Sequence, residues 1–147
     1  MQAFLDLLPY IPPTDVALFC GLLGLFLGSF YNVCSDRYLS GESILWPPSH
    51  CTTCNAKLSP LELIPLLSWL VLRGRCRHCG AAIGWRYPLM ELASGLFAAL
   101  VGYRFGASTA CLVGLVFTGL FLVLSAIDFQ AFLLPDKMTF PGAILAV

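Results

Sequence analysis

The chain has 147 residues, a length typical of one folded domain, and its eight basic side chains balance its eight acidic ones. Apolar residues make up 59% of the sequence and charged residues only 11%, against about 45–50% and about 25% in soluble domains. So few charges argue against an ordinary water-soluble globule and favour a lipid bilayer as partner, while the zero net charge gives no indication of a nucleic-acid partner.

The first predicted element is an apolar stretch at residues 16–33, which carries no charged side chain. It is long enough to cross a tilted or locally thinned bilayer. A cleaved signal peptide is the alternative, but residues 1–15 carry Asp6 and Asp15 and no lysine or arginine. Signal peptides begin with basic residues, so we predict that this stretch is a retained membrane helix.

Two further predicted membrane spans follow at residues 89–103 and 108–127. Only four residues separate them, which predicts an antiparallel helical hairpin. The later span carries small residues suited to close helix packing in lipid: Gly114, Thr118, Gly119 and Ser125. The last segment, residues 128–147, ends in an apolar stretch too short to cross a bilayer. We therefore expect the chain to be the front portion of a longer protein.

The placement of lysine and arginine predicts how the chain is oriented. Six of the eight basic residues lie between the first two spans, in residues 34–88. Positively charged loops stay in the cytoplasm, so this segment is predicted to be cytoplasmic and residues 1–15 extracytoplasmic. The sequence thus predicts an all-α, multi-pass integral membrane protein with a small cytoplasmic loop domain between helices 1 and 2. It shows no internal repeat.

The predicted loop contains four of the seven cysteines, arranged as two Cys-x-x-Cys pairs. These are Cys51, Cys54, Cys76 and Cys79. Two such pairs supply four thiolates at tetrahedral spacing, which suits zinc, and a closed four-thiolate site organises structure rather than catalysing. A cytoplasmic location disfavours lasting disulfides, so we predict a structural zinc ion. A redox dithiol or metal-free cysteines are the alternatives.

Two histidines adjoin the cysteine pairs. His50 precedes the first pair and His78 lies inside the second. Either imidazole could replace a cysteine as ligand, although solvated neighbours are the preferred interpretation.

Two carboxylates near the end of the third span are candidates for catalysis. Asp128 directly follows that span, and Asp136 follows Pro135. Two carboxylates sharing a proton would form an aspartic protease pair, but eight residues of helix separate them by roughly 12 Å, so direct contact is not expected. The alternatives are an interfacial Asp128 that faces water and an Asp136 that starts a helix.

Two glutamates have structural interpretations. Glu91 lies near the start of the second span, where the helix dipole favours a carboxylate. Glu62 follows Pro60 and is typical of a helix start.

Several motifs occur in a fixed order along the chain. They are GSFYNV at 28–33, the two cysteine pairs, ELIPLLSW at 62–69, LRGRCRHC at 72–79, RYPLMEL at 86–92 and IDFQAFLLPD at 127–136. This ordered set, which covers about residues 16–140, closely resembles the bacterial type IV prepilin peptidases, also called prepilin leader peptidase/N-methyltransferases.

The resemblance implies a multi-pass intramembrane aspartic endopeptidase of the bacterial inner membrane. Such enzymes cleave the leader peptides of type IV prepilins and pseudopilins after a glycine, on the cytoplasmic side. They then methylate the new N-terminal residue with S-adenosyl-L-methionine.

The resemblance also assigns residues. It implies that Asp128 is the first catalytic aspartate, and it matches Asp136 to a recurrent LPD aspartate of less certain role. The second catalytic aspartate of the family lies in a Gly-x-Gly-Asp motif, which this sequence does not contain. The 147-residue chain by itself is therefore expected to be inactive as a peptidase. No motif identifies the methyltransferase residues, and Glu91 is the candidate polar group near that chemistry.

Two other classes of function stay open at the level of sequence. One is a non-catalytic zinc-bearing membrane protein of pilus or secretion assembly, which would lack a Gly-x-Gly-Asp motif beyond Val147. The other is a membrane thiol oxidoreductase, which needs a redox-active cysteine pair. Metal analysis and thiol titration separate that pair from a zinc site.

Overall fold

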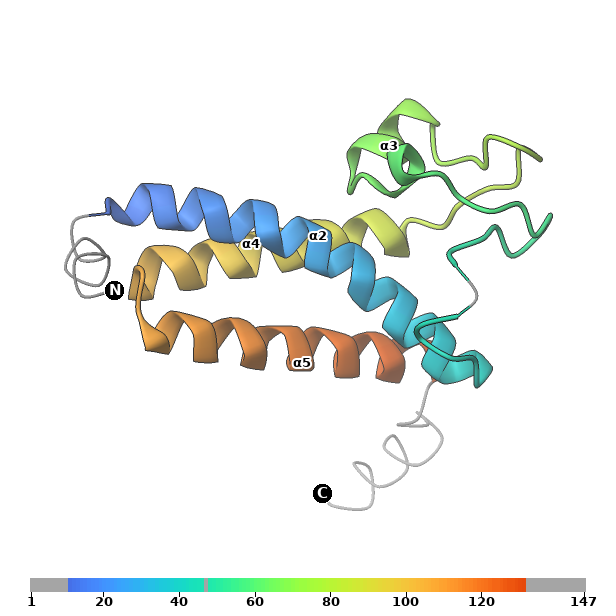
Figure 1. Ribbon diagram of the computed structural model, residues 1–147. Helices are drawn as coiled ribbons and strands as arrows, with labels where there is room; N and C mark the ends of the chain where they lie inside the picture. The colour runs from blue at the N-terminus through green and yellow to red at the C-terminus, as the bar shows by residue number, and fades with distance from the viewer. Residues whose placement is uncertain (1–10, 47, 132–147) are drawn as a thin grey trace, which may run out of the picture.

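In the computed structural model, residues 11–46 and 48–131 are described. Within them the fold is all-helical and holds no strand, which confirms the predicted helical class. Three long helices form an elongated bundle, and a compact loop region lies at one end (Figure 1). The helices are α2, Pro13–Ser40; α4, Arg86–Phe105; and α5, Thr109–Ala131, and the loop region contains the 3₁₀ turn η2, Pro60–Leu63, and the short helix α3, Leu67–Val71.

Helix α2 begins at a proline pair and ends at a glycine. Pro13 occupies the first turn, where the missing N–H of proline costs nothing. Gly41 adopts a left-handed φ of 73°, and its N–H donates to the carbonyl of Arg37, which satisfies one of the last carbonyls. The helix therefore continues through residues 34–40, beyond the apolar stretch at 16–33, because the glycine and not the loss of hydrophobicity sets its end.

Helices α4 and α5 are joined by a tight turn at residues 106–108. The N–H of Gly106 donates to the carbonyl of Gly102 at 2.9 Å and closes α4. Ser108 Oγ accepts the N–H of Cys111 at 3.3 Å and caps the start of α5. The two helices run antiparallel and pack against each other (Figure 1).

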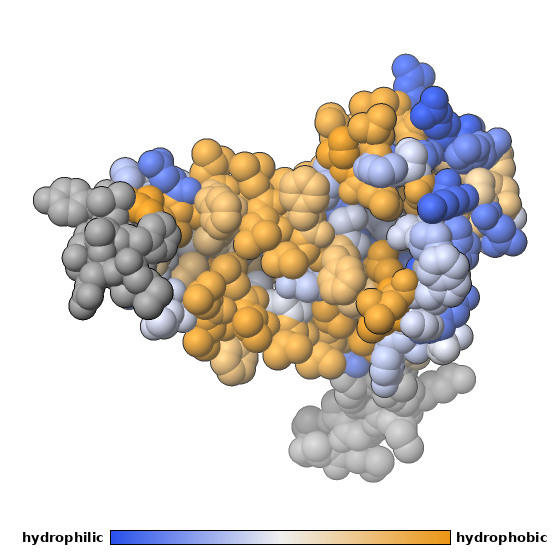
Figure 2. All heavy atoms as spheres, viewed as in Figure 1, coloured by the Kyte–Doolittle hydropathy of each residue, from blue (hydrophilic) through white to orange (hydrophobic). Residues whose placement is uncertain are grey.

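Among the described residues, two helices, α2 and α5, are long and apolar enough to cross a membrane. The outer surface of the bundle carries large exposed apolar side chains, including Phe19 and Phe121, both 68% exposed. Figure 2 shows this apolar surface over the helices, a second apolar patch over α3, and hydrophilic residues along the outer edge of the loop region. The division suits a bundle whose sides meet lipid while one end meets water.

Helix α2 packs most closely against α4, through small residues. A Cβ at Gly24 would lie only 2.6 Å from both Ala98 Cβ and the carbonyl oxygen of Ser94. A Cβ at Gly28 would lie 2.7 Å from Glu91 Cα. The two backbones meet because no side chain separates them, which is the close approach that small residues permit between membrane helices.

This contact leads to a first prediction, for Gly24→Ala. The added methyl group overpacks a contact that includes backbone atoms, so α2 and α4 must separate, at a cost of about 1–3 kcal/mol. We expect the apparent melting temperature in detergent to fall by several degrees. Gly84→Ala is the matched control, since a Cβ there meets nothing within 4 Å. Equal melting temperatures for the two variants would contradict the close packing.

Candidate functional site

The two cysteine pairs fold into the same local structure within the cysteine loop, residues 48–85. In the first, the N–H of Cys51 donates to Ala56 O at 3.0 Å, and in the second, the N–H of Cys76 donates to Ala81 O at 2.8 Å. The residue after each pair has a positive φ, 55° at Asn55 and 71° at Gly80. Antiparallel bridges between His50 and Lys57 and between Arg75 and Ala82 flank the two turns.

The two turns bring all four sulfurs of the cysteine pairs together. Their Sγ atoms all lie within 4.8 Å of one another, and Cys51 and Cys79 are 3.9 Å apart. Four sulfurs around one tetrahedral zinc ion would be about 3.8 Å apart, so the cluster needs only a small contraction to hold a metal ion. Neither neighbouring histidine belongs to this cluster, and His50 Nδ1 lies 3.1 Å from the carbonyl of Pro48.

Without a metal ion, the sulfurs of the cluster do not ionise together. The backbone N–H groups of Cys54 and Thr53 lower the pKa of the Cys51 thiol to about 6. The N–H of Ala81 acts in the same direction on Cys79, but desolvation and the neighbouring cysteine sulfurs outweigh it and raise the pKa of Cys79 to about 11. A bound cation would remove this difference, because metal ligation favours four thiolates.

The loop is fastened to the bundle by Asp36 of α2. Its carboxylate accepts hydrogen bonds from the Arg86 guanidinium and, at 2.8 Å, from the Tyr87 hydroxyl, both in the first turn of α4. The Trp69 indole N–H donates to Ile83 O at 3.2 Å. The contacts of Asp36 join the two ends of the loop to each other, and together with the Trp69 hydrogen bond they hold the loop over the end of the bundle.

A cavity of about 690 Å³ lies between the cysteine loop and the helices. That volume falls in the range of about 300–1,000 Å³ typical of small-ligand sites. Its walls come from α2, the loop, the start of α4 and the end of α5. The charged residues among them are Asp36, Arg37, Glu42, Glu62, Arg77, Arg86 and Glu91.

Three polar side chains of this cavity are candidates for ligand contacts. Glu91 is 8% exposed, and its Oε2 accepts the N–H of Leu66 at 2.7 Å. Glu62 Oε1 and Gln130 Nε2 are buried and have no hydrogen-bond partner within the part of the chain that is described. Buried polar atoms without partners are uncommon in native proteins, so these two atoms are candidates for contact with a bound ligand.

The second oxygen of Glu62 has a structural role. Its Oε2 accepts the N–H of Ser59 at 2.8 Å and the hydroxyl of Ser59 at 2.7 Å. The backbone N–H and then the hydroxyl of Ser59 hold the pKa of Glu62 below its ordinary value. This is the helix-start arrangement that the sequence indicated, here capping η2.

Asp128 lies three residues before the end of α5 and is exposed. It shares the outer face of that helix with Leu124, four residues earlier, and with Phe121, three residues before Leu124, and both of these side chains are exposed. Within the described residues it does not line the cavity, although Gln130, two residues further along α5, does. Asp136 lies outside the described residues, so the predicted separation between the two aspartates stays a prediction.

Sequence reasoning missed three features of this site. Asp36 was not singled out, although it precedes a loop whose far end carries Arg86 and Tyr87. Gln130 was not singled out because an amide at a span end has no motif. The two cysteine turns form a short structural repeat offset by 25 positions, from Cys51 to Cys76. The shared pattern Cys-x-x-Cys-x-Ala was the available signal.

Comparisons with known proteins give a consistent result. The family described as Bacterial Peptidase A24 N-terminal domain matches residues 22–105. A protein named prepilin leader peptidase/N-methyltransferase from Dickeya chrysanthemi is 41% identical over 143 residues, which covers 82% of this chain and 50% of that protein. A protein of the same name from Myxococcus xanthus (strain DK1622) is 44% identical over 131 residues, which covers 89% of this chain and 39% of that protein.

A third relative carries the same name. The protein of that name from Bacillus subtilis (strain 168) is 38% identical over 117 residues, which covers 80% of this chain and 47% of that protein. The chain thus spans about half the length of the curated relatives that it matches. No solved structure matches the chain.

Proposed function

Because the chain belongs to the bacterial peptidase A24 N-terminal domain family, we propose that it acts in an inner-membrane prepilin peptidase. The full-length enzyme would remove the leader peptides of type IV prepilins and pseudopilins after a glycine and methylate the new N-terminal residue. The observation that carries this proposal is the similarity to proteins of that name across four fifths or more of the chain.

The proposed peptidase chemistry uses Asp128. Two aspartates, one ionised and one protonated, would activate a water molecule by general acid–base catalysis. By contrast, the carboxylate of Asp36 is paired with Arg86, and that of Glu91 accepts the N–H of Leu66. The exposed position of Asp128 leaves its carboxylate accessible to a second aspartate outside the described residues. Asp136 is a secondary candidate for this chemistry.

The proposed topology is a multi-pass protein with the cysteine loop in the cytoplasm. The apolar surfaces of α2 and α5 support membrane insertion, and the basic residues of the loop support its cytoplasmic location. The last turn of α5 lines the cavity under the loop through Gln130. Asp128 would therefore lie near the cytoplasmic side, where a leader peptide can reach it.

The four clustered cysteines would hold a structural zinc ion. Cys51, Cys54, Cys76 and Cys79 supply four sulfurs at distances close to those of a tetrahedral site. N–H···S contacts support the sulfurs, such as that from His78 N to Cys76 Sγ at 3.4 Å. Four protein ligands leave no open coordination position, so the ion would stabilise the loop and take no part in cleavage.

The cavity under the loop is the proposed site of methyl transfer. S-adenosyl-L-methionine supplies an electrophilic methyl group on a positively charged sulfonium when it is bound. The buried carboxylate of Glu91 would hold positive charge in the cavity, and Gln130 Nε2 would donate to an acceptor of the ligand. Glu62 Oε1 offers a further hydrogen-bond acceptor in the same cavity.

The prediction for methyl transfer concerns Glu91→Gln in the full-length enzyme. Glutamine keeps an oxygen that can accept the Leu66 N–H, so the local fold is retained while the negative charge is lost. Since a hydrogen bond or contact to a charged group contributes about 1.5–3 kcal/mol, methylation at limiting donor concentration should slow about tenfold to a hundredfold. Mass spectrometry of the cleaved pilin measures both activities in one sample.

Prepilin cleavage by the same variant is the internal control, and Asp15→Asn is the control for loss of an acidic group elsewhere. Asp15 lies in the first turn of α2 and does not line the cavity, and the start of α2 lies at the end of the bundle opposite the loop region (Figure 1). If Glu91→Gln methylates the pilin as fast as the wild type at low donor concentration, Glu91 does not contact the donor.

The proposed function is tested by incubating the purified full-length protein with a prepilin in detergent. The expected products are a shortened pilin and a free leader peptide. Intact prepilin alongside retained zinc would instead favour the non-catalytic assembly protein. The 147-residue chain alone holds one half of the proposed aspartate pair, so we expect it to leave the same prepilin uncut.

A further inference from the structure

Two cysteines outside the loop meet between helices that are distant in sequence. Cys20 of α2 and Cys111 of α5 are 91 positions apart, yet their Sγ atoms lie 3.9 Å apart. Each residue is only 4% exposed. Neither cysteine belongs to a Cys-x-x-Cys pair, and neither has a part in the proposed metal site, cleavage or methyl transfer.

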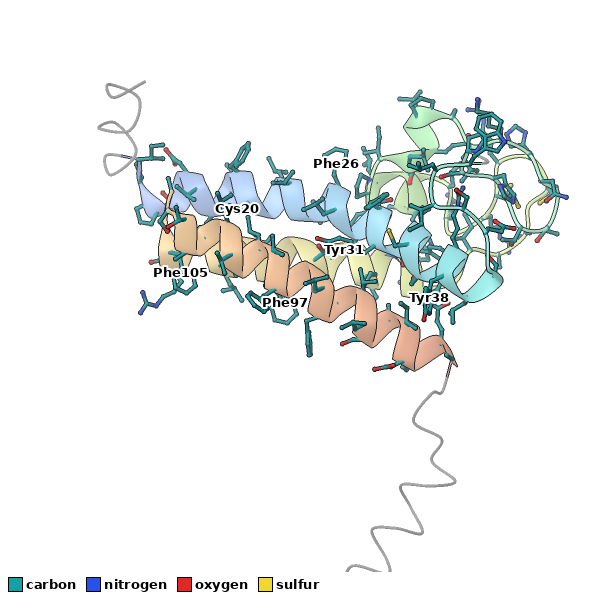
Figure 3. All side chains as sticks on the ribbon, turned by 60° about the horizontal axis from the view of Figure 1, so that its bottom comes forward. Cys20, Phe26, Tyr31, Tyr38, Phe97 and Phe105 are labelled. Atoms are coloured by element: carbon teal, nitrogen blue, oxygen red, sulfur yellow. The ribbon has the colours of Figure 1, made fainter. Side chains whose placement is uncertain are left out.

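This pair lies toward the end of the bundle opposite the cysteine loop. Cys20 is near the start of α2 and Cys111 near the start of α5, and both starts lie at that end (Figure 1). Figure 3 shows Cys20 on the side of the bundle where Phe105 closes α4, while Tyr38 lies at the loop end. With the loop in the cytoplasm, the pair therefore lies toward the extracytoplasmic face, in the direction of an oxidising compartment.

The packing around the pair favours contact between the sulfurs. Gly102 of α4 provides the space, because a Cβ there would lie 2.9 Å from both Cys20 Cβ and Cys20 Sγ. Val16 and Ala98 complete the buried cluster. The sulfurs are about 1.9 Å farther apart than the roughly 2.05 Å of a disulfide, a gap that adjustment of the two side chains and slight helix movement can close.

We propose that Cys20 and Cys111 form a disulfide bond that ties α5 to α2, an inference that rests on the proposed orientation. Two S–H bonds break and one S–S bond forms. The two protons and two electrons pass to the disulfide of an extracytoplasmic thiol oxidoreductase, which becomes a dithiol. Because both sulfurs are buried once the helices pack, this oxidation takes place before the bundle closes.

The bond has a consequence for the proposed catalytic helix. Helix α5 contacts α2 less extensively than α4 contacts α2. A covalent bond would therefore strengthen the attachment of α5 more than that of α4. The bond would fix the start of the helix whose last turn carries Asp128. The three cysteine environments would then differ in state: a linked pair at one end, a metal-bound cluster at the other and a free Cys34 in between.

The test traps thiols in membranes that contain the full-length protein. Cells with an extracytoplasmic thiol-oxidising pathway are dissolved in SDS with a maleimide, and the protein is digested without reductant. We expect a linked peptide pair that contains Cys20 and Cys111, together with maleimide on Cys34. In Cys20→Ser, Cys111 should carry maleimide instead. Wild-type protein with maleimide on both Cys20 and Cys111 overturns the proposal.

A second variant tests the orientation separately. Thr109→Cys, made in a chain with Cys20→Ser and Cys111→Ser, places an exposed thiol at the start of α5. A membrane-impermeant maleimide added to cells with an intact inner membrane should label this thiol from the outside. If the Thr109→Cys variant is labelled from outside while Cys20 and Cys111 of the wild type are not linked, only the disulfide is overturned. Labelling only after the membrane is opened overturns the orientation and the disulfide with it.

Discussion

Asp128→Asn in the full-length enzyme is expected to lower the rate of prepilin cleavage by about 10²–10⁴-fold, the contribution of a positioned general acid–base group. Asparagine has nearly the shape of aspartate but cannot accept the proton of the attacking water. Asp128 is exposed near the end of α5, so the substitution leaves the packing of the bundle intact. The loss should therefore appear in the rate and not in the melting temperature.

The matched control for this variant is Asp15→Asn, which makes the same change at an exposed aspartate in the first turn of α2. It should cleave prepilin at the wild-type rate. Methylation gives a second comparison: Asp128→Asn should still methylate a pilin supplied without its leader, since Asp128 does not line the cavity within the described residues. Cleavage by Asp128→Asn at the control rate would remove Asp128 from the mechanism.

The helices and the family were accessible from sequence because their signals are local. Uncharged runs predict long apolar helices. The ordered motifs from GSFYNV to IDFQAFLLPD resemble those of the prepilin peptidases, and the relatives confirm this resemblance. The paired Cys-x-x-Cys motifs predicted a four-sulfur cluster, and the structure brings those sulfurs within 4.8 Å of one another. Each single run or motif lies within a short segment, and only their order along the chain was needed in addition.

The contacts between helices were not accessible in the same way. Helices α2 and α5 are apolar on most sides, so the sequence pattern does not tell which face meets another helix. The approach of Cys20 to Cys111 depends on that rotation, as does the position of Gln130 at the cavity. The link from Asp36 to Arg86 depends on the path of the intervening loop.

Cys79→Ser is expected to reduce the zinc content of the purified protein from about one ion per chain to nearly none. A site with three thiolates and one weak hydroxyl ligand loses much of the binding free energy of a four-thiolate site, which reaches about 10–16 kcal/mol in zinc-finger peptides. Cys79 is exposed, so removal of its sulfur leaves no cavity in a core. The effect therefore reports on metal binding and not on packing.

The fold of the cysteine loop should depend on that ion. Pro65, Gly74 and Cys76 are the buried residues between positions 48 and 85, too small a core to order a segment of this length. In Cys79→Ser, trypsin should cut faster at the exposed Arg73, Arg75 and Arg77, while circular dichroism retains the signal of the long helices. Treatment of the wild type with a strong chelator should give the same digestion pattern.

Cys34→Ser separates this effect from a general response to the loss of a cysteine. Cys34 lies on α2 outside the four-sulfur cluster, so this variant should keep its zinc and its resistance to trypsin. If the metal-free wild type resists trypsin as well as the zinc-bound protein does, hydrogen bonds and the contacts of Asp36 are enough to hold the loop. Because the loop forms one wall of the cavity that contains Glu91, loss of zinc should also slow methylation, even though the ion contacts no reacting atom.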